Sequence, residues 1–364
     1  MLPKRANGHL AWAALAFSAA AAAADGPQKL LERMNQALMG RSYEGVFVRR
    51  QGGHEETFRI IHRVQGRAIS ERLVSLDSGR EFIRSGNQLT CYLPDQHKVL
   101  VEREPEASLL LGGLPTIDAA ASSSYEITSL KSTRFLGRKT QVIAVNPKDD
   151  YRYGYRLWID EKWAMPLKTQ LCGAEGQVIE QVMFVSPLVV NPHIPDSAFR
   201  PETATDGFLW VRNDETAPAP SAAGFPALWS ASRLPPGFHM SARAAHVMPG
   251  SDTPVAHLVF TDGIASVSVF VESHAQGGAQ PPQAESVQVG SSSAFSAVIA
   301  GHQVTAVGEV PPQTVRFIVN YVRAAAAPTA PSATGRVPTA TPTVPVATPT
   351  STPALSGTSL SLRH

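Results

Sequence analysis

The sequence lacks the residue patterns that mark metal, redox or covalent chemistry. Only two of its 364 residues are cysteines, and Cys91 and Cys172 do not form a CxxC pair, which excludes a dithiol redox motif and a zinc knuckle. None of the eleven histidines stands in an HExxH motif or an HxH pair, so no zinc site is visible. A GxSxG elbow, a Walker loop and a GxGxxG motif are also absent. These absences predict a protein that is not an enzyme and needs no cofactor.

Two pairs of adjacent carboxylates give the sequence its only, weak, indication of a catalytic site. Asp149-Asp150 and Asp160-Glu161 fall at expected strand ends or turns. A glycosidase keeps its acid and its base far apart in the sequence, so an exported hydrolase stays open as an alternative.

Charge is scarce and balanced. Charged residues make up 17% of the chain, and Lys+Arg of 32 against Asp+Glu of 30 gives a net charge of +2. Lys4 and Arg5 belong to a segment that we expect to be cleaved, which removes this small excess. A binding site for nucleic acid is therefore excluded at the level of the whole chain. The hydrophobic fraction of 43% is enough to bury a sizeable core.

Long apolar runs are missing after the first 25 residues. Within residues 1–24, Lys4 and Arg5 precede a short apolar stretch, Leu10 to Phe17, and the alanine run Ala19 to Ala24. This layout is typical of a signal peptide cleaved near Ala24, although an uncleaved membrane anchor has the same layout. We expect a mature protein that is soluble, exported and without a membrane span.

One helix and many strands are expected in residues 25–204. Pro27 lies at a first-turn position and Gly40 ends an apolar pattern of helical spacing, formed by Leu30, Leu31, Met34, Ala37 and Leu38. From Tyr43 the apolar period becomes two, and Gly- or Pro-containing turns separate the runs. The fold class predicted is mainly β (α+β): a wide, strongly curved antiparallel sheet with the helix packed on its apolar side.

Residues 105–124 break this pattern. Leu109, Leu110, Leu111 and Leu114 surround the Gly112-Gly113 pair, and glycines give an apolar segment freedom to move. Either a short core helix or a mobile apolar flap over the sheet fits this composition.

A second, smaller α+β domain is expected over residues 225–323. Residues 205–224 have the composition of a linker, with APAPSAAG at 217–224. A hairpin follows around Asp262-Gly263, and Val315, Ile318, Val319 and Val322 form the buried stripe of a closing helix. Residues 324–364, rich in Ala, Pro and Thr, are predicted to be a disordered tail.

Whether Cys91 and Cys172 pair is left open by the sequence. An exported location permits a disulfide. Cys91 alternates with Leu89 and Leu93, whereas Cys172 alternates with Lys168 and Gln170, so the two should face opposite ways. A register error of one residue would reverse that facing.

The order of these features resembles the MucB/RseB family, periplasmic regulators of the sigma-E envelope-stress pathway. The motifs that carry the resemblance are LWID at 157–160, MPLK at 165–168, LPPGF at 234–238, DGIASVSVFVE at 262–272 and VGEVPP at 307–312. They lie between the leading helix and the final helix, so the resemblance covers about residues 25–323. The tail lies outside it.

What the resemblance implies is binding. The first domain would be similar to lipoprotein carriers of the LolA type, an open half-barrel with an apolar concave face. The second domain would hold the periplasmic domain of a transmembrane anti-sigma factor and shield it from regulated proteolysis. Lipopolysaccharide or lipoprotein acyl chains would relieve that block. The alternative is a periplasmic lipoprotein or lipid carrier that uses the first domain alone, which would not need a second domain.

Two sets of candidate site residues follow. Leu109, Leu110, Leu111 and Leu114 are the candidates for a lipid groove. Arg316, Tyr321 and Arg323 are the candidates for partner binding, because they face away from the buried stripe of the final helix. Strand 264–272 is a candidate sheet edge, to which a partner segment could add a strand.

Overall fold

The computed structural model describes residues 26–103, 117, 123–213, 229–247, 254–273 and 284–324. The predicted signal peptide, residues 1–24, lies outside them. So do Leu109, Leu110, Leu111 and Leu114, and the predicted tail apart from Ala324. Neither α1 nor α2, the α-helices of the described residues, is long and apolar enough to cross a membrane.

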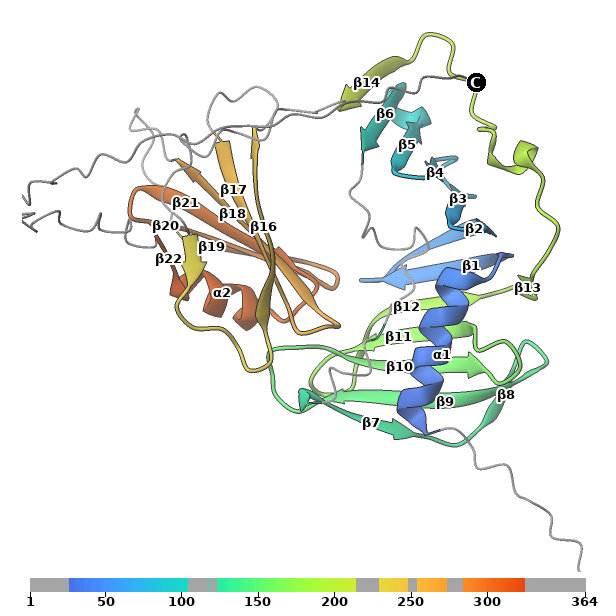
Figure 1. Ribbon diagram of the computed structural model, residues 1–364, viewed down its shortest axis with the longest axis horizontal. Helices are drawn as coiled ribbons and strands as arrows, with labels where there is room; N and C mark the ends of the chain where they lie inside the picture. Colours follow the sequence, from blue (N-terminus) through green and yellow to red (C-terminus); the bar gives the residue numbers. More distant parts are fainter. Residues whose placement is uncertain are drawn as a thin grey trace, which may run out of the picture. The chain divides into compact units, whose positions relative to one another are not determined.

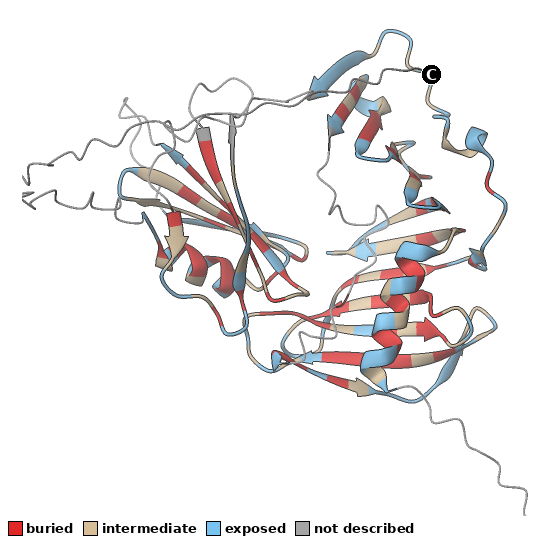
Figure 2. Ribbon diagram, viewed as in Figure 1, coloured by how far each residue is buried: buried red, intermediate tan, exposed pale blue. Residues whose placement is uncertain are grey.

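Helix α1 (Pro27–Gly40) forms where its apolar spacing predicts it. The buried side chains are those of the predicted stripe, namely Leu30, Leu31, Met34, Ala37 and Leu38. Proline begins the helix, where its missing N–H costs nothing, and the backbone becomes extended at Arg41. The helix crosses one face of a large sheet (Figure 1) and turns its exposed side to solvent (Figure 2).

The large sheet contains 14 strands of the described residues, and its central order is β14-β6-β5-β4-β3-β2-β1-β12-β11-β10-β9-β7. Its strands are β1 (Tyr43–Gln51), β2 (His54–Gln65), β3 (Ala68–Ser75), β4 (Glu81–Ser85), β5 (Gln88–Leu93), β6 (Lys98–Arg103), β7 (Tyr125–Ser129), β8 (Thr133–Phe135), β9 (Arg138–Pro147), β10 (Gly154–Asp160), β11 (Pro166–Cys172), β12 (Val178–Phe184), β13 (Val189–Val190) and β14 (Leu209–Asn213). Short 3-10 turns occupy Pro94–Gln96 and Asp196–Phe199. The curved, mainly antiparallel sheet confirms the predicted fold class.

One edge of this sheet differs from the expected antiparallel meander. Strand β14 falls within residues 205–224, which we had assigned to a linker, and it pairs with β6 in parallel. The chain therefore returns to the first sheet before it enters the second.

A row of polar and charged side chains lies buried inside the large sheet. His62, Glu71 and Arg84 occupy opposite positions on β2, β3 and β4. Glu71 lies 2.9 Å from His62 Nδ1 and accepts a hydrogen bond of 2.6 Å from Arg84 Nη1. Tyr43 stacks on the His62 ring at 4.6 Å, and burial, reinforced by the Glu71 carboxylate, raises the pKa of the Tyr43 phenol. Such a row is stable only while each charge keeps its partner.

The second sheet has the order β16-β17-β18-β21-β20-β19 and carries its own helix. Its strands are β16 (His239–Val247), β17 (Pro254–Thr261), β18 (Ser266–Ser273), β19 (Glu285–Val289), β20 (Ser292–Ile299) and β21 (His302–Gly308), followed by α2 (Pro312–Tyr321). A small separate ladder joins β15 (Trp229–Ala231) to β22 (Val322–Ala324). The predicted stripe Val315, Ile318, Val319 and Val322 is fully buried against this sheet.

The prediction that strand 264–272 is a sheet edge is wrong. Strand β18 pairs with β17 on one side and with β21 on the other, so its backbone groups are already used. Among the described strands the edges are β16 and β19, and every residue of β19 is exposed. A partner segment that added a strand to this sheet would need one of those two edges.

Cys91 and Cys172 do not form a disulfide, and both are buried. They lie on β5 and β11, between which the sheet order places β4, β3, β2, β1 and β12. Neighbouring strands lie about 4.8 Å apart, whereas bridged Cα atoms lie within about 7 Å. Cys172 is buried rather than outward-facing, and the pairing of β11 with β12 shifts register at that residue.

We predict that Glu71→Ala lowers the free energy of unfolding by about 3 to 5 kcal/mol, because it removes a buried carboxylate that accepts a hydrogen bond from the buried Arg84 guanidinium. Urea unfolding followed by circular dichroism measures this change. The matched control is Glu55→Ala, which removes an exposed ion pair with Arg50 on the same sheet and should cost about 1 kcal/mol or less. Equal losses in the two variants would contradict the account.

Candidate functional site

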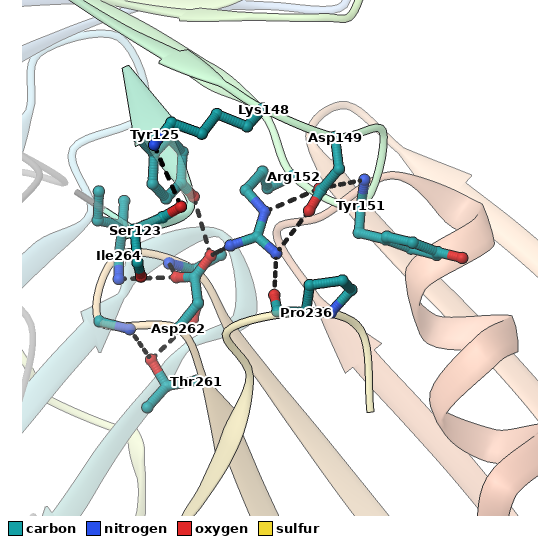
Figure 3. A network of polar contacts seen from close by, with 12 residues as sticks. Ser123, Tyr125, Lys148, Asp149, Tyr151, Arg152, Pro236, Thr261, Asp262 and Ile264 are labelled. Carbon is teal, nitrogen blue, oxygen red and sulfur yellow. Dashed lines mark hydrogen bonds and ion pairs between the residues drawn. The ribbon is translucent and has the colours of Figure 1, made fainter. Parts of the chain in front are cut away.

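The candidate site is the polar junction between the two sheets, centred on Arg152. This residue lies in the β9–β10 loop of the large sheet, and its side chain is fully buried. Its Nη1 donates a hydrogen bond of 2.6 Å to Oδ2 of Asp262, in the β17–β18 turn of the second sheet. Its Nε and Nη2 donate to the Asp149 carboxylate at 2.9 and 3.1 Å (Figure 3). One guanidinium therefore joins two carboxylates that come from different sheets.

The buried Asp262 carboxylate is fully used. Oδ1 accepts hydrogen bonds from the backbone N–H groups of Ile264 and Ala265 at 2.9 and 2.7 Å, which fixes the turn. Oδ2 accepts from Arg152 and, at 3.1 Å, from the Tyr125 hydroxyl. Because desolvation of a charge is costly unless its lone pairs are satisfied, this ion pair is stable only with the turn in place.

Aromatic rings and a glycine complete the surroundings of Arg152. The guanidinium carbon lies 5.4 Å from the Tyr125 ring centroid and 5.2 Å from that of Phe238. Nη2 also donates to the carbonyl oxygen of Pro236. Gly237, which lies between Pro236 and Phe238 in the chain, has a φ of +81°. A Cβ atom at this position would overlap Ser124 Oγ. The LPPGF motif thus lets the second sheet's chain approach the large sheet closely.

The phenols at the junction remain protonated. Burial raises the pKa of Tyr125, and the Asp262 carboxylate raises it further. Burial likewise raises the pKa of Tyr155, with contributions from the carboxylates of Glu309, Glu180 and Asp262. Tyr125 therefore acts as a hydrogen-bond donor to Asp262, and neither phenol is placed to serve as a base.

A second polar contact joins the sheets at the β19–β20 turn. The buried Ser291 Oγ lies 2.6 Å from Glu309 Oε1 and 3.1 Å from Glu180 Oε2. Gln51 Nε2 donates to both Glu180 and Ser291 at 2.8 Å. Gly290, at a φ of +60°, leaves room for Gln51, which a Cβ atom would overlap. A glycine at positive φ thus stands at each of the two contacts.

Beside the junction, a row of three aromatic rings and one arginine lies along α2. Tyr151, next to Arg152 in the chain, contacts Phe317 at a centroid distance of 5.4 Å, and Phe317 contacts Tyr321 at 4.8 Å. Arg233 lies over the Tyr321 ring at 4.9 Å and donates to its hydroxyl at 3.1 Å. We call Tyr151, Phe317, Tyr321 and Arg233 the α2 ladder. Its rings are half-buried and Arg233 is exposed, a composition typical of binding surfaces.

Of the predicted partner-binding residues, Tyr321 belongs to this ladder. Arg316 is exposed on α2 with its guanidinium 5.4 Å from the Phe295 ring centroid, and Arg323 is exposed on β22. Arg316 and Tyr321 therefore lie on α2 and Arg323 on β22. Tyr321 contacts Phe317 and Arg233, whereas Arg316 contacts Phe295.

Sequence reasoning missed Arg152, Tyr125 and Asp149 as junction residues. The sequence predicted a hairpin turn at Asp262-Gly263, and this turn is the only local signal that marks any residue of the junction. Within the described residues, no three His, Cys, Asp or Glu side chains are grouped as metal ligands would be.

We predict that Asp262→Ala separates the unfolding of the two sheets. The variant leaves Arg152 with one carboxylate and removes the acceptor of Tyr125, at a cost of about 3 to 5 kcal/mol. Scanning calorimetry should show two transitions in place of one, whereas Asp95→Ala, in an exposed turn of the large sheet, should leave the trace unchanged. One unshifted transition in both variants would contradict a coupling role for Asp262.

A further prediction concerns Gly290→Ala. Alanine at this positive φ costs about 1 kcal/mol, and displacement of Gln51 should cost about 1 to 3 kcal/mol more through the lost hydrogen bonds. The control is Gly301→Ala, because Gly301 has a φ of +76° but no neighbour within 4 Å. Urea unfolding of both variants isolates the contact, and equal destabilisation would show that Gly290 matters only for the turn.

Comparison with known protein families gives two matches along the chain. Residues 26–203 match the MucB/RseB N-terminal domain, and residues 225–323 match the MucB/RseB C-terminal domain. The sigma factor AlgU regulatory protein MucB of Pseudomonas aeruginosa is 30% identical over 305 residues, which is 82% of this chain and 90% of that protein. The sigma-E factor regulatory protein RseB of Escherichia coli K12 is 27% identical over 316 residues, 86% of this chain and 95% of that protein.

Solved structures agree with this match. The MucA/MucB complex of Pseudomonas aeruginosa contains a chain that is 27% identical, with a TM-score of 0.62, and the similarity covers 83% of this chain and 99% of that one. A crystal structure of MucB in complex with MucA(peri) gives 26% identity, a TM-score of 0.62, and coverage of 83% and 100%. The chain belongs to the MucB/RseB family.

Proposed function

We propose that this protein is a periplasmic negative regulator of a sigma-E type envelope-stress response, and that it binds the periplasmic domain of a transmembrane anti-sigma factor. The observation that carries the proposal is the similarity to MucB, which extends over both sheets and includes MucB chains solved in complex with MucA. Bound in this way, the anti-sigma factor is shielded from regulated proteolysis. Export relies on a signal peptide over residues 1–24, whose layout supports it.

The α2 ladder is the surface that we assign to the partner. Arg233, Arg316 and Arg323 are exposed on or beside it, and none of them forms an ion pair with another residue of the described chain. Half-buried aromatic rings supply contact area at little entropic cost, while unpaired cations select a partner of opposite charge. The segment bound here therefore carries carboxylates together with apolar side chains.

Position supports this assignment as much as composition does. Tyr151 belongs to the large sheet, and Phe317 and Tyr321 belong to α2, so the ladder is complete only while the two sheets are joined. The Tyr151 N–H donates to Asp149 Oδ1 at 3.0 Å, and Asp149 is also bound by Arg152. Buried Thr314 donates from Oγ1 to the Tyr151 carbonyl oxygen at 2.7 Å. The junction thus holds Tyr151 in the ladder.

Release by lipid or lipoprotein signals is the second part of the proposal. Its support is the apolar segment around Leu109, Leu110, Leu111 and Leu114, and the family resemblance of the first domain to lipid-binding folds. Ile117, the described residue nearest to that segment, is fully buried, and Asn35 of α1 bonds both its N–H and its carbonyl oxygen at 3.1 and 2.7 Å. Ile117 is thereby tied to the core of the large sheet.

We predict that the intact protein binds a soluble anti-sigma periplasmic domain, and that Tyr321→Ala combined with Arg233→Gln weakens this binding by about tenfold or more. Isothermal titration calorimetry measures both affinities. Arg134→Gln, an exposed cation on β8 of the large sheet, is the control for lost charge and should bind like the natural protein.

The outcomes separate the function from the surface. Absence of binding by the natural protein would overturn the proposed function and favour a lipid carrier. Full binding by the double variant would overturn only the assignment of the α2 ladder.

A further inference from the structure

The face of the large sheet opposite α1 carries two rows of side chains that cross the neighbouring strands β10, β11, β12, β1 and β2. The first row is Trp158, Lys168, Met183, Val48 and Thr57, and the second is Arg156, Gln170, Gln181, Arg50 and Glu55. Alternate residues of the same strands, such as Leu157 and Phe184, point to the other face, where they form the core with α1 (Figure 1). We call these two rows the outer face, and each of their side chains is exposed or half-buried.

The outer face carries an excess of positive charge. Its cations are Arg50, Lys168 and Arg156, and its one carboxylate is that of Glu55, which accepts a hydrogen bond from Arg50 Nε at 2.9 Å. The side chains of Arg50 and Glu55 are 58% and 49% exposed, so water screens this pair strongly. Within the described part of the chain, neither Lys168 nor Arg156 forms an ion pair. Two of the three cations are therefore uncompensated.

Lys168 is held in place by an aromatic ring. Its Nζ lies 4.5 Å from the centroid of the Trp158 ring, a contact that orients an ammonium group but does not neutralise it. Burial lowers the pKa of Lys168, and the Arg50 guanidinium lowers it further. Both effects disfavour the charged form of the lysine. A carboxylate brought against Lys168 would offset both, which makes an anionic group a favourable neighbour.

The side chains between the cations are fixed and suit a protein interface. Gln170 Nε2 donates to Gln181 Oε1 at 2.8 Å, and Gln181 Nε2 lies 4.0 Å from Met183 Sδ. Protein interfaces are enriched in aromatic residues, methionine and arginine. Trp158 and Met183 supply apolar contact area on strands whose backbones are paired on both sides. The outer face is therefore rigid and already shaped for a partner.

The spacing of the cations favours a polymer with several carboxylates over a single small anion. Arg156 and Arg50 stand on strands separated by β11 and β12, so their backbones lie about 14 Å apart at about 4.8 Å per strand. Lys168 lies between them in the adjacent row. A lipid surface fits less well, because segments that bind anionic membranes carry about four to eight cations. Trp158 is also half-buried between its neighbours and does not project as a membrane anchor would.

We propose that the outer face binds an acidic segment of a partner protein. The carboxylates of that segment pair with Arg50, Lys168 and Arg156, and apolar side chains beside them pack on Trp158 and Met183. The inference does not rest on the proposed regulatory function, whose partner is assigned to the α2 ladder. The outer face belongs to the large sheet alone and shares no residue with that ladder.

Fluorescence anisotropy of the intact protein with a labelled peptide built from the repeat Glu-Glu-Leu-Gly tests the proposal. Saturable binding is expected, and Lys168→Gln combined with Arg156→Gln should weaken it by about tenfold. The matched control is Arg67→Gln combined with Arg134→Gln, which removes two exposed cations elsewhere on the large sheet. This control should retain the natural affinity to within about twofold.

The α2 ladder is tested as a rival site for the same peptide. The variant Tyr321→Ala combined with Arg233→Gln should bind the Glu-Glu-Leu-Gly peptide like the natural protein. If it loses the binding that the outer-face variant keeps, the proposal is overturned.

Reversal of charge separates recognition from a loss of fold. Lys168→Glu combined with Arg156→Glu should lose the acidic peptide and bind a peptide of the repeat Lys-Lys-Leu-Gly more tightly than the natural protein does. Binding of the acidic peptide that is absent, or that falls equally in the control variant, would overturn the proposal. So would binding of phosphatidylglycerol vesicles through Lys168 and Arg156 without binding of the peptide, a result that would assign the face to a lipid surface.

Discussion

The ion pair between Arg152 and Asp262 is the interaction on which the rest of the structure depends. Its two residues lie 110 positions apart in the chain and belong to different sheets. Both side chains are fully buried. Separation of the sheets would therefore break this ion pair and leave each charge without its partner from the other sheet. Because the turn amides, Tyr125 and Asp149 satisfy the remaining polar atoms, the pair converts two sheets with separate hydrophobic cores into one unit.

That dependence extends to the surface assigned to the partner. The α2 ladder takes Tyr151 from the large sheet and Phe317 and Tyr321 from α2, so its geometry follows from the junction. A regulator that must hold its partner and release it gains from such a design, because whatever alters the junction also alters the binding surface.

Local signals predicted much of the fold, and non-local pairings account for what they did not predict. The buried stripe of α1 was predicted residue by residue, because the spacing of apolar residues in an amphipathic helix shows its buried face. In α2 the predicted Val315, Ile318 and Val319 are buried, whereas buried Thr314 was not predicted and the predicted Val322 lies on β22. Strand β3 carries no apolar period that could predict which of its faces is buried, because Glu71 and Arg72 both occupy buried positions. Arg84 and Glu81 pair with them there. The assignment of β18 to a sheet edge failed because β18 also pairs with β21, which follows later in the chain and is not marked by any local signal in β18. Arg152 carried no local signal at all, since its role exists only once Asp262 lies beside it.

The most direct test of this account is the affinity of the Asp262→Ala variant for a soluble anti-sigma periplasmic domain. Asp262 is buried and cannot touch a partner, so its effect on binding must pass through the junction. We predict a loss of about tenfold or more relative to the natural protein, with the secondary structure of both sheets retained. Unchanged affinity in a variant whose sheets unfold separately would contradict the claim that the junction forms the binding surface.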